Sequence, residues 1–174
     1  MKSTFKGIFL KNNGVFSQKY RHLLKSGQYN DGERMMQIRP AQDIDIEKIC
    51  AFDHVVALED VRRRIIEHAV ADGHLHVADE SGEILGYVIL VYTFFTLGFV
   101  DLLYVHPDHR RKGIGAALMR YAERICTTEK LFTSTNLSNT NMQSLLMNLG
   151  FEESGIVHGL DEGDPELFYR KVLK

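Results

Sequence analysis

A short run of basic residues and glycines in the middle of the chain has the composition of a phosphate-binding turn. Residues 100–118 read VDLLYVHPDHRRKGIGAAL, which is an apolar strand pattern, a proline turn, three basic residues and an amphipathic helical pattern. The N-terminus of a helix exposes unpaired N–H groups and a partial positive charge, both of which suit a phosphate. Gly113 and Gly115 carry no side chain, so a ligand could approach the backbone closely there. The segment therefore predicts a site for a phosphate-bearing ligand.

Two other kinds of glycine loop do not fit this spacing. A dinucleotide-binding fingerprint requires a third glycine where this chain has Leu118, and a P-loop requires Ser or Thr after a Gly-Lys pair. The remaining alternative is an ordinary strand-to-helix turn with solvated basic side chains, because short glycine motifs also recur by chance. The spacing alone leaves that alternative open.

The histidines and cysteines do not show the spacing of metal ligands. His106 and His109 flank Pro107 in a turn, and the sequence has no His-Glu-x-x-His or paired Cys/His pattern. We therefore expect no metal ion. Cys50 and Cys126 lie far apart in apolar patterns, so we expect both to be reduced thiols in the core.

The turn must be positioned by regular elements, and strand and helix patterns alternate from residue 36 onward. A short strand at 36–39 stops at Pro40, after which Asp43 is expected to cap a helix that runs toward His54. The other expected elements are a helix at 58–71 on the repeat of Val61, Ile65 and Ala69, three strands at 74–78, 84–92 and 99–105, a helix at 114–125, a strand at 131–135, a helix at 142–149, and strands at 151–157 and 167–172.

The first 35 residues differ in composition from the rest of the chain. They are rich in Lys, Asn, Ser and Gly, and the polar, turn-forming stretch 27–34 indicates a linker. We expect residues 1–35 to be a basic N-terminal extension, which is either an appendage or a docking arm for an acidic protein or RNA. Residues 36–174 are expected to form one domain.

Overall composition argues against several classes of protein. The net charge of −2 does not suggest a DNA-binding or membrane-binding surface. No stretch approaches the ~20 apolar residues of a membrane span, and the apolar run at 7–10 is too brief for a signal peptide. We therefore expect a cytoplasmic protein with no DNA or membrane partner. The sequence leaves the oligomeric state open, and a homodimer is one possibility.

Four motifs in the right order resemble the GNAT superfamily of N-acetyltransferases. Residues 110–115, RRKGIG, match the Arg/Gln-x-x-Gly-x-Gly/Ala pyrophosphate loop of that family, and 103–107, LYVHP, resemble the strand before it. Residues 38–41 resemble the first strand and helix cap of the family. Asn139 with the pair Gly150–Phe151 resembles its Asn…Gly-Phe motif. The resemblance covers the whole chain after the N-terminal extension.

This resemblance implies an α+β fold in three layers, α/β/α, with a mixed, mostly antiparallel sheet of six or seven strands and helices on both faces. It implies that acetyl-CoA binds as cosubstrate between two splayed strands. A primary amine, on a small molecule or a peptide, would attack the thioester directly in a ternary complex. The implied cofactor contacts fall on Leu103, Tyr104, Val105, Arg110, Arg111, Lys112, Gly113, Ile114, Gly115, Ala116 and Asn139.

The sequence departs from the family at positions that would move protons. Many relatives carry a tyrosine as general acid seven residues after the asparagine, where this chain has Leu146. Some relatives carry an acidic residue where this chain has Ser134. The alternative function is therefore a module that binds acyl-CoA as a sensor or interaction domain without turnover.

Two residues are candidates for the chemistry of an active enzyme. Asp101 interrupts an apolar strand, and desolvation there would raise the pKa of its carboxyl and suit it to accept a proton. A charge on the solvated side of the strand explains Asp101 equally well. Ser134 could hydrogen-bond the substrate, although strand hydroxyls are usually bonded within the sheet.

One acidic segment near the C-terminus has a possible bearing on the acceptor. Residues 160–167, LDEGDPEL, concentrate four carboxylates, and a solvated turn is the first interpretation. If the segment folds back over the site, its charge would favour a cationic amine.

Overall fold

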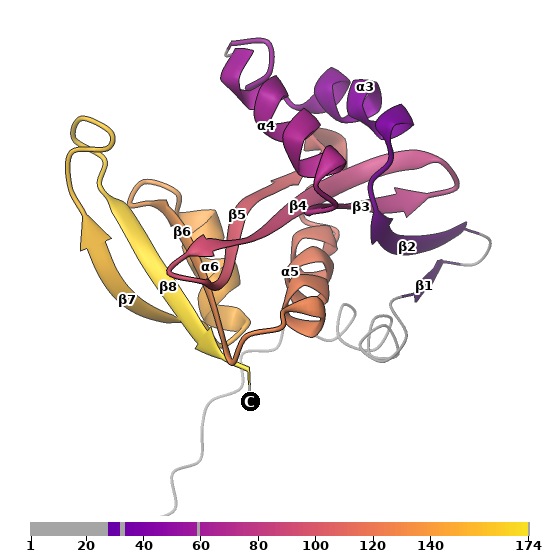
Figure 1. Ribbon diagram of the computed structural model, residues 1–174. Helices are drawn as coiled ribbons and strands as arrows, with labels where there is room; N and C mark the ends of the chain where they lie inside the picture. Colours follow the sequence, from indigo (N-terminus) through magenta and orange to yellow (C-terminus); the bar gives the residue numbers. More distant parts are fainter. Residues whose placement is uncertain (1–27, 32–33, 59, 174) are drawn as a thin grey trace, which may run out of the picture.

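The strands form one eight-stranded sheet in the computed structural model, which describes residues 28–31, 34–58 and 60–173 (Figure 1). The elements are β1 (Gln28–Asp31), β2 (Arg34–Pro40), α3 (Asp43–Phe52), α4 (Asp60–Ala71), β3 (Leu75–Glu80), β4 (Glu83–Phe94), β5 (Leu97–Val105), the short 3-10 helix η1 (Pro107–His109), α5 (Ile114–Ile125), β6 (Lys130–Asn136), α6 (Thr140–Asn148), β7 (Glu152–Val157) and β8 (Glu166–Val172). The strand order is β1-β2-β3-β4-β5-β6-β8-β7. Among the described strands, β5 and β6 are the one parallel pair. The expected mixed, mostly antiparallel sheet is confirmed.

One strand lies where the sequence predicted a linker. β1 pairs antiparallel with β2, from Gln28 opposite Gln37 to Asp31 opposite Arg34. It adds a strand to the six or seven that were expected. The sequence QYND has no apolar alternation, so only pairing with the edge of β2 reveals this strand. The rest of the expected N-terminal extension, residues 1–27, lies outside the described residues.

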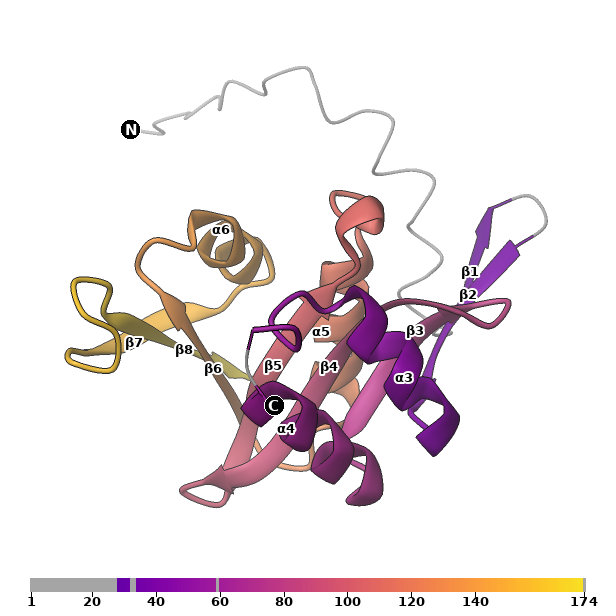
Figure 2. The ribbon, with the colours of Figure 1, turned by 90° about the horizontal axis from the view of Figure 1, so that it is seen from above.

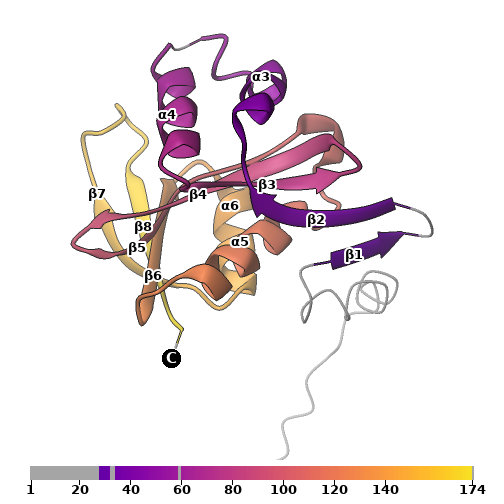
Figure 3. The ribbon, with the colours of Figure 1, turned by 45° about the vertical axis from the view of Figure 1, so that its right-hand side comes forward.

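Two apolar cores lie on opposite faces of the sheet. α5 and α6 cover one face, where Leu118, Met119 and Leu146 are fully buried against strands from β2 to β8. α3 and α4 cover the other face, and the buried residues beneath them come from β3 and β4. Figures 1 and 3 show these two helices over the middle of the sheet, with β6, β8 and β7 extending beyond them. Among the residues that the structure describes, no helix covers one face of that extension.

The helix α4 forms as predicted but buries a different face. Its buried residues are Ile66, Ala69 and Val70, whereas Val61 is 52% exposed and Ile65 is 36% exposed. The repeat at 61, 65 and 69 thus predicted the helix and only one of its core residues. Of the two cysteines, Cys126 is buried and Cys50 half-buried, and both are free thiols.

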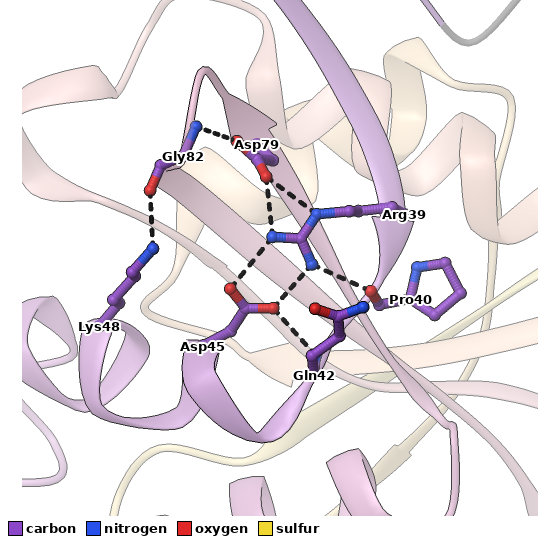
Figure 4. A network of polar contacts seen from close by, with 7 residues as sticks. All are labelled: Arg39, Pro40, Gln42, Asp45, Lys48, Asp79 and Gly82. Atoms are coloured by element: carbon purple, nitrogen blue, oxygen red, sulfur yellow. Dashed lines mark hydrogen bonds and ion pairs between the residues drawn. The ribbon is translucent and has the colours of Figure 1, made fainter.

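An ion pair between the half-buried Arg39 and the buried Asp45 fixes the start of α3 against the sheet (Figure 4). Gln42 is the N-cap, so Asp43 begins the helix and does not cap it as expected. Asp45 accepts the backbone N–H of Gln42 at 2.9 Å and two guanidinium bonds from Arg39, at 2.7 and 3.0 Å. Arg39 also donates to Asp79 at 2.9 Å. One arginine of β2 therefore joins α3 to Asp79 in β3, whose carboxylate also accepts the Gly82 N–H of the turn that follows.

This arrangement predicts acid-sensitive stability. The Arg39 guanidinium lowers the pKa of the Asp45 carboxyl, so the stabilisation is complete above the unfolded pKa of about 4 and is lost as pH falls through the folded value. We expect Asp45→Asn to lower the free energy of unfolding by about 2 kcal/mol at pH 7, less than for a fully isolated buried pair because Asp79 remains. Urea denaturation at pH 7 and at pH 3 measures this difference.

Asp43→Asn is the matched control, because that exposed carboxylate lies in the same helical turn. Its effect should stay within ~0.5 kcal/mol at both pH values. An Asp45→Asn deficit that persists undiminished at pH 3 would contradict the ion-pair account.

Candidate active site

The strands β5 and β6 are paired for only three residue pairs before they separate. The register joins Gly98 with Leu131, Phe99 with Phe132 and Val100 with Thr133. At the last pair the Thr133 hydroxyl donates to the Val100 carbonyl at 2.9 Å. Beyond it β5 stays paired with β4 and β6 with β8, and Figure 2 shows the two strands diverging. We call the divergence between 101–105 and 134–136 the fork.

Asp101 is the extra residue of a β-bulge at the base of the fork. Ile89 of β4 is opposite Leu102 and Leu90 is opposite Val100, which leaves Asp101 without an opposite residue. A bulge bends its strand and increases the local twist. The bulge therefore occurs where β5 turns away from β6.

The two sequence-predicted catalytic residues flank the fork from opposite strands. Asp101 follows the last paired residue of β5, and Ser134 follows the last paired residue of β6. The Asp101 side chain is exposed to solvent. The protein atoms around it nevertheless desolvate the carboxyl in part, which raises its pKa. The positive charge of Arg62 on α4 opposes that rise.

The basic turn leads from the end of β5 into α5, at the open end of the fork. Gly113 is the N-cap of α5 with φ 85°, and Arg111 has φ 63°. A left-handed φ favours glycine at the cap, because a side chain would be strained there. The side chains of Arg111 and Lys112 are exposed. The turn thus presents the free N–H groups of a helix N-terminus together with two cationic side chains.

Arg110 differs from the other two basic residues because it bonds back to β5. Its Nε donates to the Val105 carbonyl at 3.3 Å and its Nη2 to the Tyr104 hydroxyl at 3.4 Å. The guanidinium carbon lies 5.6 Å from the centroid of the Tyr104 ring. Arg110 therefore braces the end of the strand.

The start of α6 lies near the same end of the fork. Asn139 is the N-cap of α6, and its side-chain oxygen accepts the N–H of Met142 at 3.2 Å. A Cβ atom at Gly115 would lie 3.5 Å from Leu145 and 3.6 Å from Val105, so Gly115 lies between β5 and α6. The predicted cofactor residues of β5, α5 and α6 are thereby brought together.

Leu146, the position at which the resemblance leads one to expect a tyrosine, is a core residue. Leu146 is fully buried in the core beneath α5 and α6. A larger side chain there would overpack the core. Leu146 therefore serves the core, and its side chain has no group that could move a proton.

A buried polar network on the α3–α4 face was not foreseen from the sequence. The Asp53 carboxylate is 1% exposed and accepts the Tyr87 hydroxyl at 2.6 Å and the Val55 N–H at 3.0 Å. The Nε of Arg62 lies 3.6 Å from the same carboxylate. Tyr87 also stacks on Tyr104 of β5, with centroids 6.0 Å apart. The signal was present, since a tyrosine within the aliphatic run ILGYVILV needs a partner for its hydroxyl.

A second unforeseen residue, His54, lies beside the strand that forms the fork. Its Nδ1 and the Tyr104 hydroxyl share a short hydrogen bond. The Phe52 ring stacks on Tyr104 and also contacts His106. A titratable imidazole and a phenol thus meet next to Arg110.

The acidic segment between β7 and β8 is anchored to the turn after β6. Asn136 donates to the Asp161 carboxylate at 2.8 Å, and Ser138 donates to Asp164 through its N–H at 2.9 Å and its hydroxyl at 2.6 Å. β6 ends at Asn136, on the open side of the fork. The segment is therefore a bonded loop beside the fork, and two of its carboxylates have structural partners.

Within the part of the chain that the structure describes, no group of three or more His, Cys, Asp or Glu side chains could hold a metal ion. Among the same residues, no helix is both long and apolar enough to cross a membrane.

Comparison with known proteins gives one consistent result. The model of the acetyltransferase (GNAT) family matches residues 35–151. A GNAT-family acetyltransferase structure from Bacillus cereus is 36% identical, with a TM-score of 0.74 over 79% of this chain and 97% of that one. The structure of yncA from Salmonella typhimurium, solved with its cofactor acetyl-CoA, is 23% identical, with a TM-score of 0.65 over 80% of this chain and 94% of that one. At this identity, the similarity to yncA shows that the two chains share a fold.

Another relative matches over a shorter segment. An acetyltransferase of Stachybotrys chartarum is 35% identical over 72 residues. The match spans 41% of this chain and 31% of that relative.

The buried network generates a stability prediction. Tyr87→Phe removes a hydroxyl donor from the buried Asp53 carboxylate, so the free energy of unfolding should fall by about 1–3 kcal/mol. Tyr92→Phe is the matched control, because the Tyr92 hydroxyl accepts the exposed Thr127 N–H, which water can satisfy. Urea unfolding curves compare the two variants. Equal losses of unfolding free energy in the two variants would show that the Tyr87 hydroxyl does not stabilise the buried Asp53 carboxylate.

Proposed function

The chain belongs to the acetyltransferase (GNAT) family, and on that premise we propose that it transfers the acetyl group of acetyl-CoA to a primary amine. The observation that carries the proposal is the fork with the N-terminus of α5 at its open end. Unpaired strand edges can accept a ligand's hydrogen bonds, and a helix N-terminus suits an anion.

The residues at the fork fit a diphosphate-bearing thioester. The first-turn N–H groups of α5 and the exposed Arg111 and Lys112 would hold the pyrophosphate, and Gly113 and Gly115 leave the backbone accessible. Backbone groups of Leu103 to Val105, with Asn139 from α6, would hold the arm that carries the thioester. The acetyl group would then lie near the base of the fork.

The transfer requires two proton movements and one exchange of bonds. The acceptor ammonium loses a proton to the Asp101 carboxylate, and the free amine forms a bond to the thioester carbonyl carbon. The carbon–sulfur bond breaks, and the second proton from the nitrogen goes to the departing thiolate. The products are an amide and free CoA, and Asp101 returns its proton to solvent. Asp101 suits this role because its raised pKa makes it a stronger base than an ordinary carboxylate.

The cofactor assignment predicts the effect of a substitution at the cap of α5. Gly113→Ala places a side chain on a left-handed residue, which should distort the helix N-terminus and weaken acetyl-CoA binding at least tenfold. Calorimetric titration measures the affinity.

Gly73→Ala is the matched control for this substitution. Gly73 also has a left-handed φ, 72°, and a Cβ there would meet no atom within 4 Å. Both variants should lose about 1 kcal/mol of stability, and only Gly113→Ala should lose affinity. Parental affinity in Gly113→Ala would remove the phosphate turn from the proposal.

The proposed base predicts a separation of binding from chemistry. Asp101→Asn should keep acetyl-CoA affinity and lower kcat by ~100-fold or more, the scale for losing a general base. In the parent, kcat/KM should fall as pH drops through the raised pKa of Asp101, and the variant should lack this acidic limb. Steady-state assays of CoA release against pH measure both quantities.

Asp72→Asn, at an exposed site after α4, is the control and should match the parent. An unchanged rate and profile in Asp101→Asn would exclude Asp101 as base. The paired His54 and Tyr104, or water held by Ser134, would then be the next candidates. Tight acetyl-CoA binding without turnover on any amine would favour the binding-module function.

A further inference from the structure

Four phenylalanines gather on the face of the sheet that α3 and α4 leave uncovered. The Phe94 ring lies 4.8 Å from Phe99, 5.3 Å from Phe132 and 5.8 Å from Phe168, measured between centroids. Phe99 and Phe168 are 6.2 Å apart. These rings belong to neither buried core, and three of them are only half-buried. We call them the phenylalanine face.

Strand alternation places these rings opposite α5 and α6. Leu131, Leu167 and Tyr169 point into the core beneath those helices, so their strand neighbours Phe132 and Phe168 point to the other face. The burial of these rings is incomplete because the cluster beneath α3 and α4 ends at β5. Half-buried aromatic rings at this place provide an apolar surface that water covers poorly.

The sheet register sets this face directly beside the candidate catalytic residues. Phe99 is opposite Phe132 one row before the last paired row of Val100 and Thr133, and Ser134 is opposite Phe168 in the first row of the fork. Asp101 follows in β5 at the level of that same row. The apolar surface thus begins where the acetyl group would be attacked.

The charges around the phenylalanine face suit an amine. Asp101 lies at its edge, and the loop with Asp161 and Asp164 is bonded at the end of β6. Two arginines on this side have acidic partners: Arg170 lies 3.6 Å from Glu152, and Arg62 of α4, whose charge reaches Asp101, lies 3.6 Å from Asp53. A cation is therefore attracted at one end of an apolar patch.

We infer that the phenylalanine face binds the acceptor, and that the acceptor is a small primary amine on an aromatic or bulky apolar group. This inference rests on the proposed acetyl transfer. The rings would pack against the carbon skeleton, and Asp101 would receive the ammonium group. The acceptor reaches the fork from the α3–α4 side, whereas the cofactor turn approaches from α5.

The test compares 2-phenylethylamine with ethanolamine as acceptors. These amines share an aminoethyl group and differ in the phenyl or hydroxyl group that it carries. We expect kcat/KM for 2-phenylethylamine to be at least tenfold higher, because apolar contact at this scale discriminates by one to two orders of magnitude. Equilibrium binding of 2-phenylethylamine to the CoA-loaded chain gives a measure that does not depend on turnover.

Substitutions test whether the phenylalanine rings cause the preference for 2-phenylethylamine. Phe132→Ala should raise KM for 2-phenylethylamine tenfold or more, with little change for ethanolamine or in acetyl-CoA affinity. Phe132→Leu keeps an apolar residue and tests the same contact if the alanine variant does not fold. Met147→Ala is the control, because it removes an exposed apolar side chain from α6 on the opposite face.

The outcomes separate this inference from the proposed function. Turnover that favours ethanolamine, or 2-phenylethylamine that does not bind the CoA-loaded chain, overturns the inference while acetyl transfer stands. Failure to bind acetyl-CoA or to acetylate any amine overturns the proposed function. If the rings instead pack against a second copy, Phe132→Ala will dissociate a dimer in sedimentation velocity, which also overturns the inference.

Discussion

The short parallel ladder between β5 and β6 is the constraint on which the rest of the site depends. Three residue pairs hold the strands together, and at the last pair the Thr133 hydroxyl donates a hydrogen bond to the Val100 carbonyl. Directly after it, the bulge at Asp101 turns β5 away with β4, while β6 follows β8. A longer ladder would pair the strand edges with each other and leave no backbone groups free for a ligand.

The two faces of the sheet on either side of this ladder have different roles in the proposed site. On one side α5 and α6 pack over strands from β2 to β8 and bring the basic turn and Asn139 to the open end of the fork. On the other side α3 and α4 stop at β5, which leaves the phenylalanines of β6 and β8 half-buried. The partly buried Arg39–Asp45 pair holds α3 in its place on this second face. Cofactor and acceptor can therefore approach the same carbon from opposite sides.

Local sequence patterns predicted most of the fold, and the features that they did not predict depend on pairing between distant residues. The helices, and the strands from β2 onward, followed from periodicity and punctuation, and the glycine turn was found from its own spacing. The strand β1 was not predicted, because its sequence lacks a strand pattern and it forms only by pairing with β2. The bulge at Asp101 and the contact of Asp53 with Tyr87 join residues far apart in sequence, so no window of residues contains them. The phenylalanine face could not be predicted for the same reason, since its rings come from four strands, β4, β5, β6 and β8.

Hydrogen exchange with and without acetyl-CoA tests the central claim most directly, because it reports on backbone groups at the fork. The account predicts slower amide exchange at 102–105, 113–116 and 134–136 on addition of acetyl-CoA, because the ligand would occupy strand edges and helix N–H groups that are otherwise open to solvent. Exchange in α4 and β7 should remain unchanged. Protection that spares both strand edges, or that appears only in elements away from the fork, would contradict the assignment of the fork as the cofactor site.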